Sequence, residues 1–245
     1  MDRAAFELMA AAERDHWWFR GRREIIAAAL ELVVPATGAR LLDAGCGSGG
    51  NLALLSRFGD VSAFEFDDAA RAAAQSTGPT HIEFGALPDA IPFPDRHFDV
   101  IGLFDVLEHL EKPVESLAAL AARLGAAGAI VITVPALPML WGPHDVHHQH
   151  FRRYTSRTLR AHVEAAGLRL EYHTYFNALL LPVAIAQRVR ERLVGYSTGN
   201  LMPGHRLNEW LFRIFSLERR WIPRHSLPVG LSLLAIARRP GEGPR

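Results

Sequence analysis

The sequence predicts an α/β protein whose mostly parallel sheet is covered by helices on both faces. Short apolar runs alternate with helical patterns over the first half of the chain. Each run is apolar at nearly every position, which is typical of parallel strands buried on both sides. A glycine cluster follows the first run directly, as in strand-to-helix turns that bind a ligand.

Composition fits one folded domain of enzyme size. The chain has 245 residues, of which 49% are hydrophobic and 22% charged. Cys46 is the single cysteine, so an internal disulfide and a zinc site built on several thiolates are excluded. The first residues lack a secretory pattern and the apolar stretch 178–186 is too short to span a bilayer. We therefore expect a cytoplasmic protein.

The elements follow in order. Amphipathic helices at 3–14 and 22–33 flank an aromatic segment, 16–19, and residues 1–36 are interpreted as an N-terminal helical lid. The remaining residues, 37–245, form the main domain. Its first half is predicted to contain strands at 40–43, 61–66, 81–84, 98–104 and 129–134, with helices at 51–57, 68–75 and 114–124.

A different pattern begins after the fifth strand. Residues 135–154 form a long connection rich in Pro, His and aromatic residues, and such loops are often functional. A helix at 155–166 ends at Gly167, and strands are predicted at 168–176 and 229–237. Between these strands, about residues 177–227, lies a helical insertion with apolar helices at 179–193 and 207–221.

The glycine cluster indicates a nucleotide-type cofactor without identifying it. A strand that ends in Gly45 and Gly47 and enters a helix offers backbone amides to a ligand. Together with Gly50, and with Glu65 about 20 residues further on, these glycines also satisfy the dinucleotide fingerprint. A nicotinamide-dependent oxidoreductase therefore remains an alternative.

Asp43 favours a cofactor with a positively charged group over a dinucleotide. Its carboxylate, directly before the glycine turn, would repel a pyrophosphate about 4 Å away by several kcal/mol in a partly buried site. A cofactor that carries an ammonium group there is favoured instead. S-adenosylmethionine has such a group on its methionine end, and a ribose diol for Glu65.

Several segments are similar to motifs of the class I S-adenosylmethionine-dependent methyltransferases. They are residues 43–49 (DAGCGSG), Phe64-Glu65, 98–101 (FDVI) and 105–110 (DVLEHL). The resemblance covers about residues 40–176. It implies a Rossmann-like, doubly wound seven-stranded sheet, mostly parallel with an antiparallel last strand, plus N-terminal helices and a helical insertion before that strand. Residues 16–23 and 150–155 resemble a bacterial subgroup whose substrates are mostly unassigned.

The resemblance also implies a cofactor site. Glu65 would accept hydrogen bonds from the ribose, and Phe66 would stack near the adenine. Where the family often has an acid for the adenine amino group, this sequence has Ala86 and Leu87. The other residues expected to line the cofactor are Asp43, Gly45, Cys46, Gly47, Gly49, Phe104 and Asp105.

Histidines and arginines are the candidate residues around the molecule that would accept the methyl group. His109 and His150 are candidate general bases, because imidazole titrates near neutral pH. The histidines of residues 144–150 could bind a metal, line the substrate pocket or be solvated, and the sequence favours pocket lining without a metal. The residues expected to contact substrate are Trp18, His144, Arg152, Arg153 and Tyr154.

Charge and hydropathy indicate the acceptor class only broadly. Residues 1–149 have a net charge of −9 and residues 150–245 of +10, so the basic part is either a solvated face or faces an anionic group. The two insertion helices are apolar and are followed by arginines. They could contact a membrane surface, form a homodimer interface or cap a pocket, and the protein could equally be a monomer. No nucleic acid is expected.

The sequence thus predicts an S-adenosylmethionine-dependent methyltransferase, with S-adenosylhomocysteine as product, acting on a small or lipid-like acceptor. Oxygen is favoured over nitrogen and carbon as the methylated atom. An NAD(P)-dependent oxidoreductase and a non-catalytic protein that binds an adenosyl ligand are the alternatives.

Overall fold

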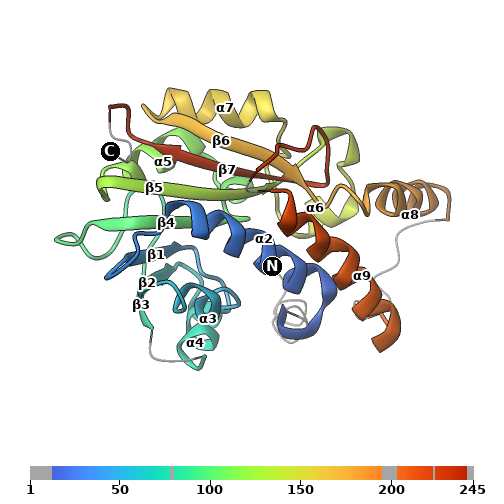
Figure 1. Cartoon of the computed structure of the whole chain (residues 1–245), viewed down its shortest axis with the longest axis horizontal. Helices are drawn as coiled ribbons and strands as arrows, with labels where there is room; N and C mark the ends of the chain where they lie inside the picture. The colour runs from blue at the N-terminus through green and yellow to red at the C-terminus, as the bar shows by residue number, and fades with distance from the viewer. Residues whose placement is uncertain (1–12, 78–79, 195–202, 223, 242–245) are drawn as a thin grey trace.

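The chain folds around one seven-stranded sheet. The computed structural model describes residues 13–77, 80–194, 203–222 and 224–241. The strand order is β3-β2-β1-β4-β5-β7-β6, and β7 alone runs antiparallel to its neighbours, which confirms the predicted fold class (Figure 1). The strands are β1 Arg40–Ala44, β2 Asp60–Glu65, β3 His81–Phe84, β4 Phe98–Phe104, β5 Leu124–Pro135, β6 Arg169–Phe176 and β7 Ser232–Arg238.

Helices cover both faces of the sheet. Successive strand residues point to opposite faces, so Leu41 packs in one apolar layer and Leu42 in the other, and both are fully buried. The first layer includes α2, α3 and α9, and the second includes α5 and α7. The helices are α2 Trp17–Val33, α3 Leu52–Leu55, α4 Asp68–Gln75, α5 Pro113–Ala121, α6 Pro143–His147, α7 Ser156–Ala165, α8 Leu181–Val194 and α9 His205–Leu217.

Three helix predictions need correction. The helix predicted at 22–33 begins earlier, because Trp17–Phe19 form the first turn of α2, where the His16 ring caps the helix by accepting the Trp18 N–H at 3.2 Å. The helix predicted at 51–57 is reduced to the short α3. The connection 135–154 contains α6, so His144 and His147 are helical. The helix predicted at 3–14 falls almost entirely outside the described residues.

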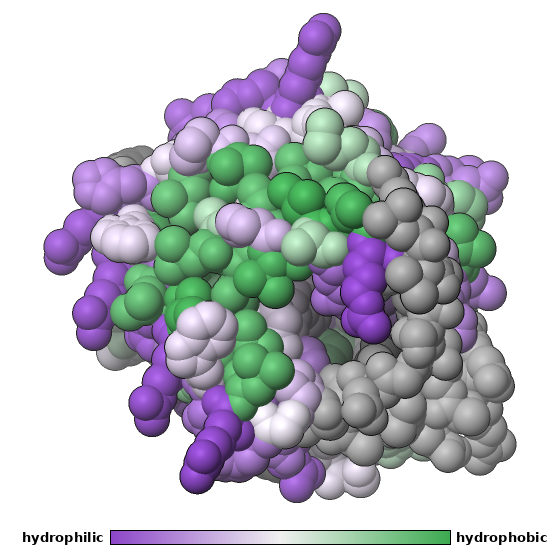
Figure 2. Space-filling model, turned by 90° about the vertical axis from the view of Figure 1, so that its right-hand side faces the viewer, coloured by the Kyte–Doolittle hydropathy of each residue, from purple (hydrophilic) through white to green (hydrophobic). Residues whose placement is uncertain are grey.

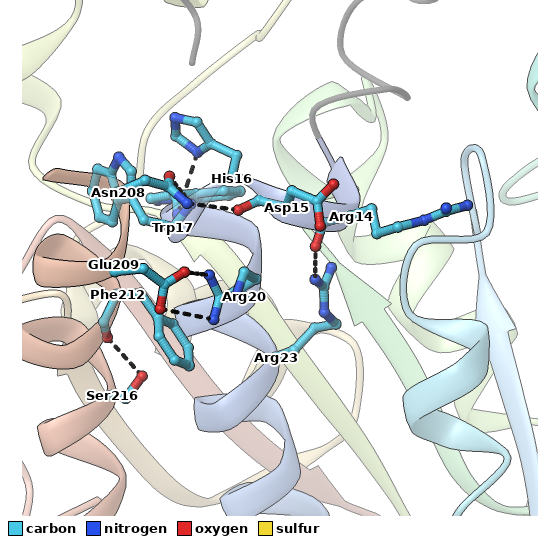
Figure 3. A network of polar contacts seen from close by, with 11 residues as sticks. Arg14, Asp15, His16, Trp17, Arg20, Arg23, Asn208, Glu209, Phe212 and Ser216 are labelled. Carbon is cyan, nitrogen blue, oxygen red and sulfur yellow. Dashed lines mark hydrogen bonds and ion pairs between the residues drawn. The ribbon is translucent and has the colours of Figure 1, made fainter. Parts of the chain in front are cut away.

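The insertion packs against the N-terminal helix. Asn208 of α9 accepts the Trp17 N–H at 2.9 Å and donates to the Asp15 carbonyl at 2.9 Å, and Arg20 forms an ion pair with Glu209 (Figure 3). Any side chain at position 21 would overlap the Phe215 ring, with its Cβ only 2.2 Å from Cδ1. Gly21 therefore permits the close approach of α2 and α9.

A buried carboxylate holds the start of the insertion. Glu218, in the 3-10 turn Glu218–Arg220 after α9, accepts three successive backbone N–H groups just beyond β6. The N···O distances to Asn177, Ala178 and Leu179 are 2.6, 2.8 and 2.9 Å.

Within the described part of the chain, none of the helices combines the length and hydropathy needed to cross a bilayer.

Candidate functional site

The glycine loop lies at the carboxyl end of β1, where open α/β sheets bind their ligands. Gly45, Gly47 and Gly49 have φ of 80°, 55° and 88°, which is the left-handed region that favours glycine. The Gly45 and Cys46 N–H groups both donate to the Phe64 carbonyl at the end of β2, so the loop is fixed to two strands. The Cys46 side chain is buried beneath it.

Asp43, the last residue but one of β1, carries a buried carboxylate with an unused oxygen. Its side chain is 1% exposed, and Oδ2 has no hydrogen-bond partner among the described residues. Burial raises the pKa of Asp43 to about 7, although Arg22 acts in the opposite direction. This carboxylate is therefore available to a cationic ligand group.

Arg22 reaches the same place from α2 and was not predicted as a site residue. It is 5% exposed, forms an ion pair with Asp105 and lies 3.5 Å from the Asn51 side-chain oxygen. Its Nε is buried and has no partner in the described structure, and its guanidinium lies 5.1 Å from the Trp18 ring centre. The available signal was an arginine on the same helical face as Ile25 and Ile26.

These two side chains fit the methionine end of S-adenosylmethionine. That end is a zwitterion with an ammonium and a carboxylate. Asp43 and Arg22 offer one buried acceptor and one buried donor without a partner among the residues that the structure describes. Buried polar groups are rarely left so unless a ligand or water completes them.

Backbone hydrogen bonds fix the orientation of the carboxylate of Glu65, the last residue of β2. Its carboxylate accepts the N–H groups of Gly47, Phe66 and Asp67 at 2.9, 2.9 and 3.0 Å. The Phe66 ring beside it is 68% exposed and available for stacking. Ala86 and Leu87, the predicted adenine neighbours, are half-buried, and Ala86 pairs with Ala90 in a short backbone bridge.

Glu13 is a second residue that sequence reasoning missed. The Ser48 hydroxyl of the glycine loop donates to its carboxylate, and a Cβ at Gly50 would collide with it. Arg23 of α2 donates to the Glu13 carbonyl at 2.9 Å and to the Arg14 carbonyl at 3.0 Å, the latter visible in Figure 3. The chain before α2 is thereby held over the loop.

Asp105 and Phe104 lie at the end of β4, as the resemblance implied. Phe104 is buried, whereas Asp105 has a φ of 55°, and its Oδ2 accepts the Thr133 hydroxyl at 3.0 Å. Leu137 after β5 and Asn177 after β6 have φ of 59° and 56°. Left-handed residues other than glycine are strained and concentrate at functional sites, and here they mark one edge of the sheet.

A cluster of histidines and carboxylates lies next to Asp105. The His109 and His150 ring centres are 4.7 Å apart, and the His150 Nδ1 lies 3.0 Å from Asp145 Oδ1. Burial alone would raise the pKa of Asp145, but hydrogen bonds from His150 and Arg153 outweigh it and hold that pKa below its usual range. His144 joins the cluster through His148, with ring centres 4.2 Å apart.

Burial shifts the pKa values of Glu108 and His109 in this cluster in opposite directions. Burial, and then the nearby His150 ring, lower the pKa of His109 to about 4. Glu108 is 1% exposed, and burial followed by the charge of Asp105 raises its pKa well above the usual value. Its Oε2 is buried and unpartnered among the described residues.

The segment 152–154 holds the histidine loop to the sheet. Arg153 donates to Asp145 at 2.6 Å and to the Ala136 carbonyl at 3.1 Å, and Arg152 donates to the Glu111 carbonyl at 3.4 Å. Tyr154 is fully buried in the second core layer, with its hydroxyl 3.4 Å from the Leu107 carbonyl. These three side chains therefore already have protein partners.

An apolar surface lies beside the site. Figure 2 faces the side that carries α8 and α9, and apolar side chains gather there next to a hollow. The exposed apolar residues of the insertion are Leu179, Val183, Ile185, Val189, Leu207, Trp210, Leu217 and Trp221. We call these residues the insertion patch.

Comparisons with known proteins agree with this geometry. The model of a methyltransferase domain family matches residues 16–173. A probable S-adenosylmethionine-dependent methyltransferase of Mycobacterium tuberculosis is 30% identical over 123 residues, which are 49% of this chain and 43% of that protein. One of Mycolicibacterium smegmatis is 27% identical over 161 residues, 64% of this chain and 61% of that protein. The matched part is thus less than two thirds of either relative.

Solved structures show the same fold at low identity. A putative methyltransferase in complex with the Haloferax volcanii Trm112 activator superposes with a TM-score of 0.62 at 19% identity, covering 99% of both chains. The plantazolicin methyltransferase BpumL, solved with SAH, gives 0.62 at 15% identity, covering 97% of this chain and 90% of that one.

The match to the family model, the strand order of the sheet and the glycine loop all indicate the same protein family. The chain belongs to the methyltransferase domain family, and it has the Rossmann-like fold of the class I S-adenosylmethionine-dependent methyltransferases.

Proposed function

We propose that this protein transfers a methyl group from S-adenosylmethionine to an oxygen of a small or lipid-like acceptor. The observation that carries the proposal is the pair of unpaired buried atoms, Asp43 Oδ2 and Arg22 Nε. Asp43 would hold the ammonium and Arg22 the carboxylate of the methionine end. Glu65 would accept the ribose hydroxyls, and Phe66 would cover the adenine.

The protein's own task is to place the acceptor and remove its proton. When bound, S-adenosylmethionine supplies a methyl carbon whose bond to sulfur breaks, with the electron pair staying on sulfur, as the acceptor oxygen bonds to that carbon. A hydroxyl must also lose its proton, and a positioned base assists this loss. His109 and His150, next to Asp105 at the cofactor end, are the candidate bases, and Asp145 orients His150.

The insertion patch supports a lipid-like acceptor. Exposed apolar side chains of this number on one side of a protein usually mark an interaction site. Basic residues accompany them, as at surfaces that contact lipid. We propose that the N-terminal segment and the insertion, held together by α2 and α9, close over the acceptor.

The dinucleotide alternative is not proposed. Asp43 and Glu13 place two carboxylates at the glycine loop, one behind it and one over it. A pyrophosphate on the same amides would be repelled by both.

Isothermal titration with S-adenosylmethionine tests the proposal. Asp43→Asn keeps the shape but removes the charge, and loss of a charged hydrogen bond worth about 1.5–3 kcal/mol weakens binding roughly 10- to 150-fold. Arg22→Gln should behave similarly. Asp95→Asn, at an exposed position away from the loop, is the control and should bind as the unaltered protein does.

Two results would overturn the assignment. One is an Asp43→Asn variant that binds S-adenosylmethionine as tightly as the control. The other is an unaltered protein that binds NAD⁺ but not S-adenosylmethionine in the same titration.

A further inference from the structure

The cluster beside Asp105 is assembled from two distant segments. Glu108 and His109 belong to the 3-10 turn Leu107–His109 after β4, and His150 follows α6. The Phe151 N–H donates to the Glu108 carbonyl at 2.8 Å, and the His150 N–H donates to the Asp145 carbonyl at 2.9 Å. The first of these backbone hydrogen bonds joins the two segments, and the second fixes the turn that carries His150.

Glu108 has a buried carboxyl group that forms no ion pair with any residue that the structure describes. Its Oε2 has no partner in the described part of the chain. The two nearest cationic groups are engaged elsewhere, Arg22 with Asp105 and Arg153 with Asp145. An unpaired buried carboxylate is costly, and it is normally completed by a paired charge or a metal ion.

His150 is oriented as metal-binding histidines are. Its Nδ1 is bonded to Asp145, which leaves Nε2 as the nitrogen free to coordinate. A carboxylate behind a coordinating imidazole fixes its tautomer and ring direction. Arg153, at 2.6 Å from the same Asp145 oxygen, fixes the carboxylate in turn.

We propose that Glu108, His109 and His150 bind one divalent transition-metal ion. One ligand atom from each of the three lies within 4.8 Å of the others. Ligands bonded tetrahedrally to one ion at about 2.1 Å lie roughly 3.4 Å apart, so a closing movement of about 1 Å between ligand atoms completes the site. The sequence did not indicate this site, because the Glu108-His109 pair lies about 40 residues before His150.

Two imidazoles and one carboxylate leave coordination positions open. This ligand set suits Zn²⁺ and other borderline divalent ions, and it occurs where an exchangeable ligand binds the metal. Bound to the ion, His109 and His150 would no longer act as bases; the ion itself would bind an acceptor hydroxyl and lower its pKa, so that the proton passes to solvent water before the oxygen bonds to carbon. This last step rests on the proposed methyl transfer, whereas metal binding itself does not.

Metal titration of the full chain, with any affinity tag removed and metal stripped by a chelator, tests the site. We expect one Zn²⁺ per chain by calorimetry, and visible absorption bands when Co²⁺ is added instead. Glu108→Gln and His150→Ala should weaken Zn²⁺ binding at least about tenfold. Glu115→Gln and His97→Ala change an exposed acid and an exposed histidine outside the cluster and should leave it unchanged.

Further measurements separate lost metal binding from lost folding and from a wrong proposed function. Zn²⁺ should raise the Tm of the unaltered protein and not that of Glu108→Gln. If that variant does not fold, His109→Ala, at a partly exposed ring, gives the same comparison. Metal binding without S-adenosylmethionine binding would refute methyl transfer but not this site.

An unaltered protein that binds neither Zn²⁺ nor Co²⁺, or folded variants that bind Zn²⁺ as tightly as the controls, would refute the metal site. Retained S-adenosylmethionine affinity in that case would leave the proposed function standing.

Discussion

At the scale of single residues, the site is built from charges that are buried but not fully paired. Asp43 and Arg22 both lie within the core, and each keeps one polar atom without a partner among the described residues. Such an arrangement costs stability, and it is expected where a ligand supplies the missing partner. The raised pKa of Asp43 is the measurable sign of that cost.

S-adenosylmethionine affinity should therefore depend on pH. Burial raises the pKa of Asp43 to about 7, and only the ionised carboxylate attracts the cofactor ammonium. Lowering the pH from 8 to 6 protonates most of this carboxylate in the free protein, so the Kd should rise about tenfold. Calorimetry at each pH should also show proton release on binding near pH 7.

The Asp43→Asn variant provides the comparison for this pH series. It has no charge to titrate at this position, so its weaker affinity should stay nearly constant over the same range. An unaltered protein whose Kd is equally flat between pH 6 and 8 would contradict the raised pKa.

The residues that the sequence predicted around the glycine loop come from the ends of two neighbouring strands. Asp43, the loop glycines and Glu65 all follow directly from strand ends, and strand ends in a parallel sheet meet at one edge. Arg22 and Glu13 reach the loop from a separate helix and the turn before it, and no local pattern encodes that contact. The proximity of Glu108 to His150 was missed for the same reason, because the two residues lie far apart in sequence.

At the scale of elements, the strands were predicted better than the helices. Helix α4 and strands β3 and β4 have the predicted bounds, since buried runs flanked by turn residues are locally distinct. The start of α2 was missed because Trp17 and Trp18 are bulky aromatics of modest helix propensity, and packing on α9 and the core determines their conformation.

Gly21 should determine how closely α2 and α9 pack. Gly21→Ala places a methyl group inside the Phe215 ring, and such overpacking costs about 1–3 kcal/mol in free energy of unfolding. We expect a lower Tm and a lower denaturant midpoint.

Gly125→Ala is the matched control for this substitution. A Cβ at Gly125 would come no closer than 3.5 Å to a neighbouring atom, which is ordinary van der Waals contact, so stability should be unchanged or slightly higher. A Gly21→Ala variant as stable as this control would mean that the two helices do not approach as described.

At the scale of the molecule, ion pairs within the chain join its acidic first part, residues 1–149, to its basic second part, residues 150–245. Arg219, from the basic part of the chain, forms ion pairs with Glu24 and Glu31 of α2. The sequence left open whether the basic face is solvated or meets an anionic group. For this arginine, the partner is the acidic part of the same chain.

Methyl transfer to a lipid-like acceptor should depend on the insertion patch. Replacing Val183 and Trp210, which are 53% and 56% exposed, by serine removes apolar surface without disturbing the core. With radiolabelled S-adenosylmethionine, labelling of a total lipid extract should fall about tenfold or more, while the Kd for the cofactor stays unchanged.

Leu32→Ser, at an exposed apolar position on α2, is the control. Label that appears only in water-soluble products, or lipid labelling that survives the double substitution, would rule out this role of the insertion patch.

Helix α2 has a consequence for how such proteins could be re-engineered. Arg22 on this helix forms an ion pair with Asp105 at the end of β4, and its neighbours Arg20 and Gly21 contact α9. Grafting a foreign insertion to change the acceptor would therefore shift the helix that supplies the guanidinium. A transplant should succeed only when α2 and α9 are exchanged as a matched pair, so the two segments are expected to behave as one module in chimaeras.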